Sequence, residues 1–203
     1  MMKLFYSTET SSMMCVIAVF ELGIECELVE VSFARDIKVK ELEELNPLGA
    51  VPALITEDGQ ALTQNLAILE YLSDQDERRS LAGRGRFERA DILRWTAFAL
   101  SDLRPWVVSC LTAEDIEDVR SKAIFRETAD ERIGDYLAHL DSVLAGKNYV
   151  CGEAFTVADC ALVNVLPTFE WIGFELSKFP NISRYLEELS HRPSVKKASA
   201  MEA

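Results

Sequence analysis

The chain has 203 residues, of which 49% are hydrophobic and 27% charged, and its formal net charge is −13. This composition excludes an intrinsically disordered chain and a small scaffold that depends on disulfides. The acidic excess repels phosphate backbones and anionic lipid, so neither nucleic acid nor a membrane surface is expected as a partner.

The five cysteines are widely spaced, contain no Cys-x-x-Cys pair and are accompanied by two histidines. This spacing fits no zinc site, so no metal is expected. Four of the five lie in apolar surroundings, which is typical of buried thiols in a reducing compartment. The N-terminus has no signal-peptide pattern, and the longest apolar run, residues 13–20, is far too short to span a membrane. The expected location is the cytoplasm.

The first third of the chain alternates short strands and helices. Strands are predicted at residues 3–6 and 26–31, and a helix closed by Gly23 at residues 13–22. Because a helix separates the two strands, they are expected to pair in parallel as a right-handed βαβ unit. A helix, two hairpin strands and a second helix are predicted next, at residues 38–45, 51–55, 61–63 and 65–72. The order βαβαββα predicts a compact α/β domain.

Residues 73–89 are charged and poor in apolar side chains, which indicates a domain boundary. We therefore expect an α/β domain at residues 1–76, a linker at 77–88 and an all-α domain at 89–203. Helical periodicity predicts a helix at 90–103 that ends near Pro105, and a long one at 114–144. Thr156 and Asp159 resemble a capping box that opens a further helix, and short helices are predicted at 182–190 and 194–200.

Three segments then carry a resemblance to a known family. The segments NPLGAVPAL at 46–54 and LTQNLAILEYL at 62–72 resemble the glutathione-binding half of cytosolic glutathione transferases. The segment YVCGEAFTVAD at 149–159 is similar to that family's all-helical half, and the two ends of the chain look most like the bacterial beta class. The resemblance implies a thioredoxin-like domain followed by an all-α domain, a homodimer, glutathione as co-substrate and a small hydrophobic electrophile.

The resemblance also implies a glutathione site. A cis Val51-Pro52 bond, preceded by Ala50, would present the Val51 backbone to an extended tripeptide. The helix that starts at Gln64 and Asn65 would receive the γ-glutamyl carboxylate on its free N–H groups, although the family usually has Ser or Thr where Asn65 stands.

Basic residues are implied at two further places. Arg35 and Lys38 are both candidates for the glycine carboxylate of glutathione. Arg104 stands where the beta class has a histidine, and a guanidinium near a thiolate favours the anion.

The implied catalytic position is occupied by a serine. Beta-class enzymes usually carry a cysteine at the start of the first helix, and Ser11 takes that place here. A hydroxyl at a helix N-terminus can donate to a thiolate, but Ser11 can equally be a plain N-cap. Thr10 and Tyr6 are alternates, and Cys15 is either a reactive thiol or a buried, inert one.

The expected function is transfer of glutathione to an electrophile held between the two domains. Two alternatives remain open: a transferase-like protein that binds or regulates without catalysis, and a glutathione-dependent disulfide reductase.

Overall fold

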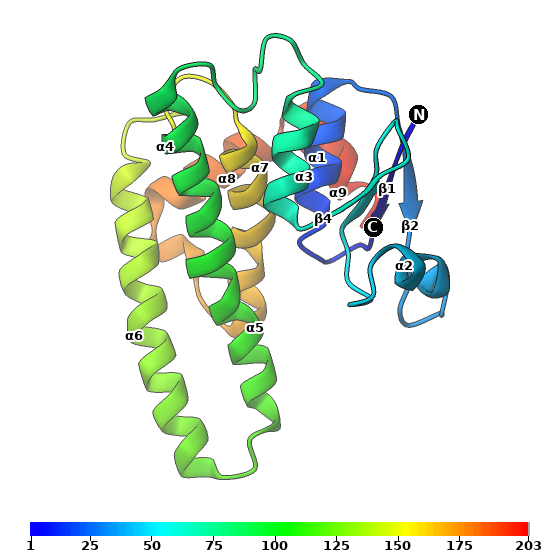
Figure 1. Cartoon of the computed structure of the whole chain (residues 1–203). Helices are drawn as coiled ribbons and strands as arrows, with labels where there is room; N and C mark the ends of the chain where they lie inside the picture. Colours follow the sequence, from blue (N-terminus) through cyan, green and yellow to red (C-terminus); the bar gives the residue numbers. More distant parts are fainter. Residues whose placement is uncertain (203) are drawn as a thin grey trace. The chain divides into compact units, whose positions relative to one another are not determined.

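The computed structural model describes residues 1–202 and contains two compact units (Figure 1). The first unit comprises Met1–Arg89 and the segment from Ser190 onward. The second unit, Ala90–Leu189, is helical. The expected class, a thioredoxin-like α/β domain combined with an all-α domain, is confirmed.

A four-stranded mixed sheet forms the centre of the first unit. Its strands have the order β2-β1-β3-β4. Their bounds are β1 Met2–Tyr6, β2 Cys26–Glu30, β3 Ala53–Ile55 and β4 Ala61–Thr63. Strands β1 and β2 pair in parallel, as predicted, while β3 pairs antiparallel with both β1 and β4.

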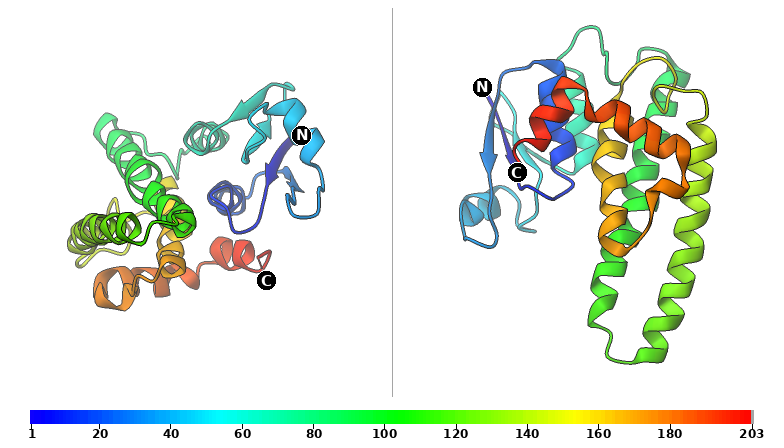
Figure 2. Two further views of the ribbon diagram at one scale, coloured as in Figure 1. Left: turned by 90° about the horizontal axis from the view of Figure 1, so that it is seen from below. Right: turned by 180° about the vertical axis from the view of Figure 1, so that it is seen from behind.

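Helices cover both faces of this sheet. They are α1 Met13–Leu22, α2 Val39–Leu45, α3 Asn65–Ser73 and α9 Pro193–Ser199. Figures 1 and 2 show α1 and α3 on one face and α2 on the other. On the α2 face, the side chain of Leu42 packs against Phe5 and Ala53 of the sheet. Helix α1 ends at Gly23, whose φ of 62° costs glycine little conformational energy. In this conformation the Gly23 N–H donates to the Val19 carbonyl.

A half-buried ion pair joins α9, near the end of the sequence, to α1, near its start. The Arg192 Nε donates to Glu21 Oε2 at 2.8 Å, and the Ser194 hydroxyl donates to the same oxygen at 2.6 Å. Burial raises the pKa of the Glu21 carboxyl, but these hydrogen bonds and the Arg192 charge outweigh burial, so the pKa lies below its ordinary value. The C-terminal helix is thereby fixed to the sheet-containing unit.

Replacing Glu21 by Gln is expected to lower the free energy of unfolding by about 1.5 kcal/mol at neutral pH, because charge-assisted hydrogen bonds are lost. A carboxyl whose pKa is depressed by folding stabilises the fold above its unfolded pKa and ceases to do so as the pH falls through the folded pKa. The difference from wild type should therefore shrink in urea unfolding curves as the pH falls below the ordinary pKa of a glutamate. The exposed Glu25→Gln variant is the control, and a pH-independent difference for Glu21→Gln would contradict this account.

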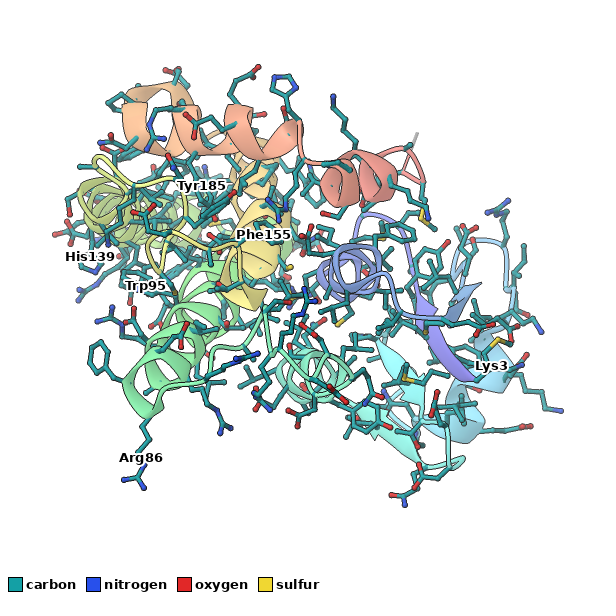
Figure 3. The ribbon with its side chains drawn as sticks, turned by 90° about the horizontal axis from the view of Figure 1, so that it is seen from above. Lys3, Arg86, Trp95, His139, Phe155 and Tyr185 are labelled. Carbon is teal, nitrogen blue, oxygen red and sulfur yellow. The ribbon has the colours of Figure 1, made fainter. Side chains whose placement is uncertain are left out.

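The helical unit is built from one interrupted helix and the three later helices. The interrupted helix is α4 Arg86–Ala97 with α5 Arg104–Thr112, and the later helices are α6 Val119–Val143, α7 Val157–Val165 and α8 Pro180–Ser190. Short 3-10 segments occur at Ala113–Asp115, Leu166–Ile172 and Leu176–Lys178. Figure 3 shows Trp95 and His139 near each other in this unit, where their rings stack with centroids 5.8 Å apart.

Two predicted helix ends are wrong. The helix expected to stop near Pro105 continues to Thr112, because a π-helical turn at Phe98–Leu103 places the proline in the first turn of α5, where its missing N–H is tolerated. The helix expected from residue 114 starts at Val119, because Asp118 caps it by accepting from the Ser121 N–H at 2.8 Å.

The predicted capping box at Thr156 and Asp159 is present. The Asp159 carboxylate is fully buried, and its Oδ2 accepts from the N–H and the hydroxyl of Thr156 at 2.8 and 2.9 Å. Its Oδ1 accepts from the Val150 N–H at 2.9 Å and from the Tyr185 hydroxyl at 2.7 Å. One carboxylate therefore connects the start of α7 to the preceding loop and to α8.

Candidate functional site

The loop before β3 has a shape fixed by Asn46. Its side-chain Nδ2 donates to the Ala50 carbonyl at 2.6 Å, and its Oδ1 accepts from the Leu48 N–H at 3.2 Å. The loop ends in a cis peptide bond between Val51 and Pro52, as expected. Ala50 is exposed, Val51 is half-buried and Pro52 is buried, so the approach to the cis bond lies at the surface of the first unit.

Gln64 has an unusual backbone conformation at the start of α3. Its φ is 75° and its ψ is 126°, in a region that residues other than glycine rarely adopt. Its side chain is exposed. Strained backbone at an exposed helix start is characteristic of binding sites, where the surrounding fold maintains it.

Ser11 is held by the start of α3 and does not cap α1. The N-cap of α1 is Ser12, so the interpretation of Ser11 as a plain N-cap is wrong. Ser11 is 8% exposed, and its Oγ accepts a hydrogen bond from Asn65 Nδ2 at 3.0 Å. A side-chain hydrogen bond thus links Asn65, the first residue of α3, to Ser11, which lies just before α1.

Cys15 lies on the other side of Asn65. Its side chain is fully buried, and its Sγ donates to Asn65 Oδ1 over 3.5 Å. Burial raises the pKa of the Cys15 thiol far above the neutral range. Cys15 is therefore a neutral hydrogen-bond donor, and a reactive thiolate at this position is disfavoured.

The alternates Thr10 and Tyr6 are engaged or buried. The Thr10 hydroxyl donates to the Ser7 carbonyl at 2.7 Å and lies 2.7 Å from Ser12 Oγ, which stabilises the loop before α1. Tyr6 is 5% exposed, and burial, with a smaller effect from the Glu30 charge, raises the pKa of its phenol. Ser11 differs from these two candidates: its hydroxyl accepts from Asn65, which leaves the hydroxyl proton for another acceptor.

The three basic candidates lie in different settings. Arg35 is exposed, and its guanidinium lies 3.5 Å from a Glu30 carboxylate oxygen. Lys38 has a φ of 61° and its Nζ lies 2.6 Å from Glu41, whose hydrogen bond and charge raise the pKa of the amine. Arg104, half-buried, is the first residue of α5 in the helical unit, and burial lowers the pKa of its guanidinium.

One residue of the site, Asn46, and two contacts of Asn65 were not found from the sequence. Asn46 as the brace of the loop has a local signal, since Asn before Pro is typical of a side-chain-stabilised turn. The bonds of Asn65 to Ser11 and Cys15 have no such signal, because they join residues 54 and 50 positions apart.

Among residues 1–202, no group of three or more His, Cys, Asp or Glu side chains is arranged to hold a metal ion. None of the helices within those residues has the length and apolar character needed to cross a membrane.

Comparisons with known proteins match this chain along nearly its whole length. The N-terminal domain of glutathione S-transferases matches residues 1–74, and the C-terminal domain of the same family matches residues 103–193. Glutathione S-transferase GstA of Escherichia coli is 28% identical over 208 residues, covering 99% of this chain and 98% of its own.

Two solved structures are similar to this chain in both fold and sequence over nearly its whole length. A sphingomonad glutathione S-transferase complexed with glutathione is 31% identical, covers 98% of both chains and has a TM-score of 0.84. A bacterial beta class glutathione S-transferase of Sphingomonas chungbukensis is 31% identical, covers 99% of this chain and 98% of its own, and has a TM-score of 0.86. With both of its domains matched and relatives of this similarity spanning it from end to end, the chain belongs to the glutathione S-transferase family.

Proposed function

We propose that this protein binds glutathione on its first unit, stabilises the glutathione thiolate with the Ser11 hydroxyl, and transfers the sulfur to a small hydrophobic electrophile. We propose further that it acts as a cytoplasmic homodimer of the beta-class type. The structure of a related sphingomonad transferase complexed with glutathione supports the choice of co-substrate.

The observation that carries the proposal is the position of Ser11. The residue is 8% exposed, and its hydroxyl accepts from Asn65, so the oxygen's own proton remains for another acceptor. A thiolate is such an acceptor, and a hydrogen bond to the charged form lowers the pKa of the thiol that produces it. Ser11 has no sulfur, so no mixed disulfide with glutathione is formed at this position.

The rest of the site binds and orients the tripeptide. The Val51 backbone, beside the cis bond to Pro52, pairs with the extended tripeptide as an added strand would. The N-terminus of α3 at Gln64 and Asn65 takes the γ-glutamyl carboxylate, because free N–H groups and the positive end of the helix dipole favour an anion. Arg35 or Lys38 meets the glycine carboxylate.

The reaction then needs little from the protein beyond a lowered thiol pKa and correct placement. The glutathione thiol loses its proton to solvent, and the sulfur lone pair forms a bond to the electrophilic carbon. The leaving group departs with the electron pair of its former bond, or, in an addition, the adjacent atom receives that pair and then a proton. Holding the sulfur and carbon together supplies the entropic part of the rate enhancement.

Replacing Gln64 by Ala is expected to weaken glutathione binding by about tenfold, which corresponds to the loss of roughly 1.4 kcal/mol. The reason is that the side chain beside the proposed anion-binding helix start is lost and the strained backbone there is altered. Calorimetric titration of glutathione into both proteins measures the change. Gln75→Ala, an exposed glutamine just beyond the other end of α3, is the control and should bind as wild type does. Equal affinities for wild type and Gln64→Ala would place the ligand elsewhere.

A further inference from the structure

A continuous set of hydrogen bonds runs behind the Ser11 hydroxyl. The Cys15 Sγ donates to Asn65 Oδ1 at 3.5 Å, and Asn65 Nδ2 donates to Ser11 Oγ at 3.0 Å. The three side chains come from two helix starts, since Ser11 and Cys15 flank the beginning of α1 and Asn65 is the first residue of α3.

The orientation of the Asn65 amide is decided by Cys15. The thiol is fully buried and therefore remains protonated, because burial raises its pKa. A protonated thiol can donate to an amide oxygen, and Asn65 Oδ1 lies 3.5 Å from Sγ, nearer than the Asn65 backbone carbonyl at 4.0 Å, which favours the amide with Oδ1 toward the thiol. The amide's two N–H groups then face the other way, toward Ser11.

The orientation of the Ser11 hydroxyl is decided in turn by Asn65. A serine hydroxyl has one proton and two acceptor sites. With an amide N–H donating to one acceptor site, the proton cannot point back toward Asn65 and is left for another acceptor. A donor that is aimed before the ligand binds avoids the cost of reorganisation when charge develops on the ligand.

We propose that Cys15 and Asn65 are positioning residues that act through Ser11: the buried thiol sets the Asn65 amide, and the amide aims the Ser11 proton at the sulfur of bound glutathione. This inference rests on the function proposed above. It assigns the Asn65 side chain to the thiolate end of the site, and leaves the backbone N–H groups of α3 to bind the γ-glutamyl carboxylate.

The test is the pKa of the bound glutathione thiol, measured from the ultraviolet absorption of its thiolate as the pH is raised. In Cys15→Ala the Asn65 amide loses its fixed orientation, and the thiol pKa should rise by about half a unit or more. Cys15→Ser keeps a donor in place and should restore the wild-type value. Asn65→Asp keeps the shape but removes the N–H that faces Ser11 and offers the serine proton a competing carboxylate, so the pKa should rise by about one unit or more.

Controls separate this inference from the proposed function. Cys110→Ala removes an equally buried thiol in the helical unit and should leave the thiol pKa unchanged. If the variants bind glutathione with wild-type affinity in calorimetry but Cys15→Ala and Asn65→Asp show the wild-type thiol pKa, the positioning role is overturned and the proposed function stands. If wild type itself binds no glutathione, the proposed function fails first.

Discussion

Replacing Ser11 by Ala is expected to lower kcat/KM for conjugation by about 100-fold or more, the usual effect of removing one hydrogen-bond donor aimed at an anion in an enclosed site. The glutathione thiol would then ionise as it does in solution, so the fraction of bound thiolate at neutral pH falls. Glutathione affinity should change little, because Ser11 contacts the sulfur and not the tripeptide backbone. Initial rates with glutathione and a chlorodinitrobenzene as the test electrophile measure the effect.

Two further variants serve as controls for the Ser11→Ala result. Ser142→Ala removes an exposed serine on α6 and should react at the wild-type rate. Cys15→Ala should lose far less activity than Ser11→Ala, since it acts through the serine. The opposite order, with Cys15→Ala inactive and Ser11→Ala active, would move the nucleophilic chemistry to the protein thiol and contradict the account.

Replacing Asp159 by Ala is expected to lower the free energy of unfolding by about 3 kcal/mol or more, because buried donors are left without an acceptor. The carboxylate is fully buried and accepts hydrogen bonds from Val150, Thr156 and Tyr185 at 2.7–2.9 Å. These bonds form the start of α7 and its connection to α8. Urea unfolding followed by circular dichroism measures the loss.

The asparagine variant tests the geometry of this carboxylate. Each Asp159 oxygen accepts from two donors, so an amide in its place must turn its NH₂ toward one pair of them. Asp159→Asn should therefore be nearly as unstable as Asp159→Ala, despite its similar size. Tyr185→Phe removes one donor and should cost about 1 kcal/mol. Stabilities of Asp159→Ala and wild type within about 1 kcal/mol of each other would contradict this interpretation.

Local patterns in the sequence predicted the parts of the fold that local physics determines. Helix α1 runs from Met13 to Leu22 and stops at Gly23, as predicted, because the apolar run and the left-handed glycine both act within one or two turns. The capping box at Thr156 and Asp159 was found for the same reason. The Val51-Pro52 bond was found through the resemblance of its segment to a family.

Other features depend on contacts that no local pattern records. The helix that continues through Pro105 does so because a π-helical turn precedes the proline, and the sequence of residues 98–103 carries no distinctive sign of it. Tyr185 reaches Asp159 from 26 residues away. The candidate site divides in the same manner: the loop and the helix start were predicted, whereas the bonds from Asn65 to Ser11 and Cys15 depend on how α1 and α3 pack together.

The pKa of the glutathione thiol bound to the wild-type protein tests the central claim most directly. A spectrophotometric pH titration of the complex reports the thiolate itself and needs no knowledge of the electrophile. The account predicts a pKa at least about one unit below the value near 8.5 that an unperturbed thiol has, so that bound glutathione is substantially ionised at neutral pH. A bound thiol that titrates as free glutathione does would contradict the account, because the protein would then bind the co-substrate without activating it.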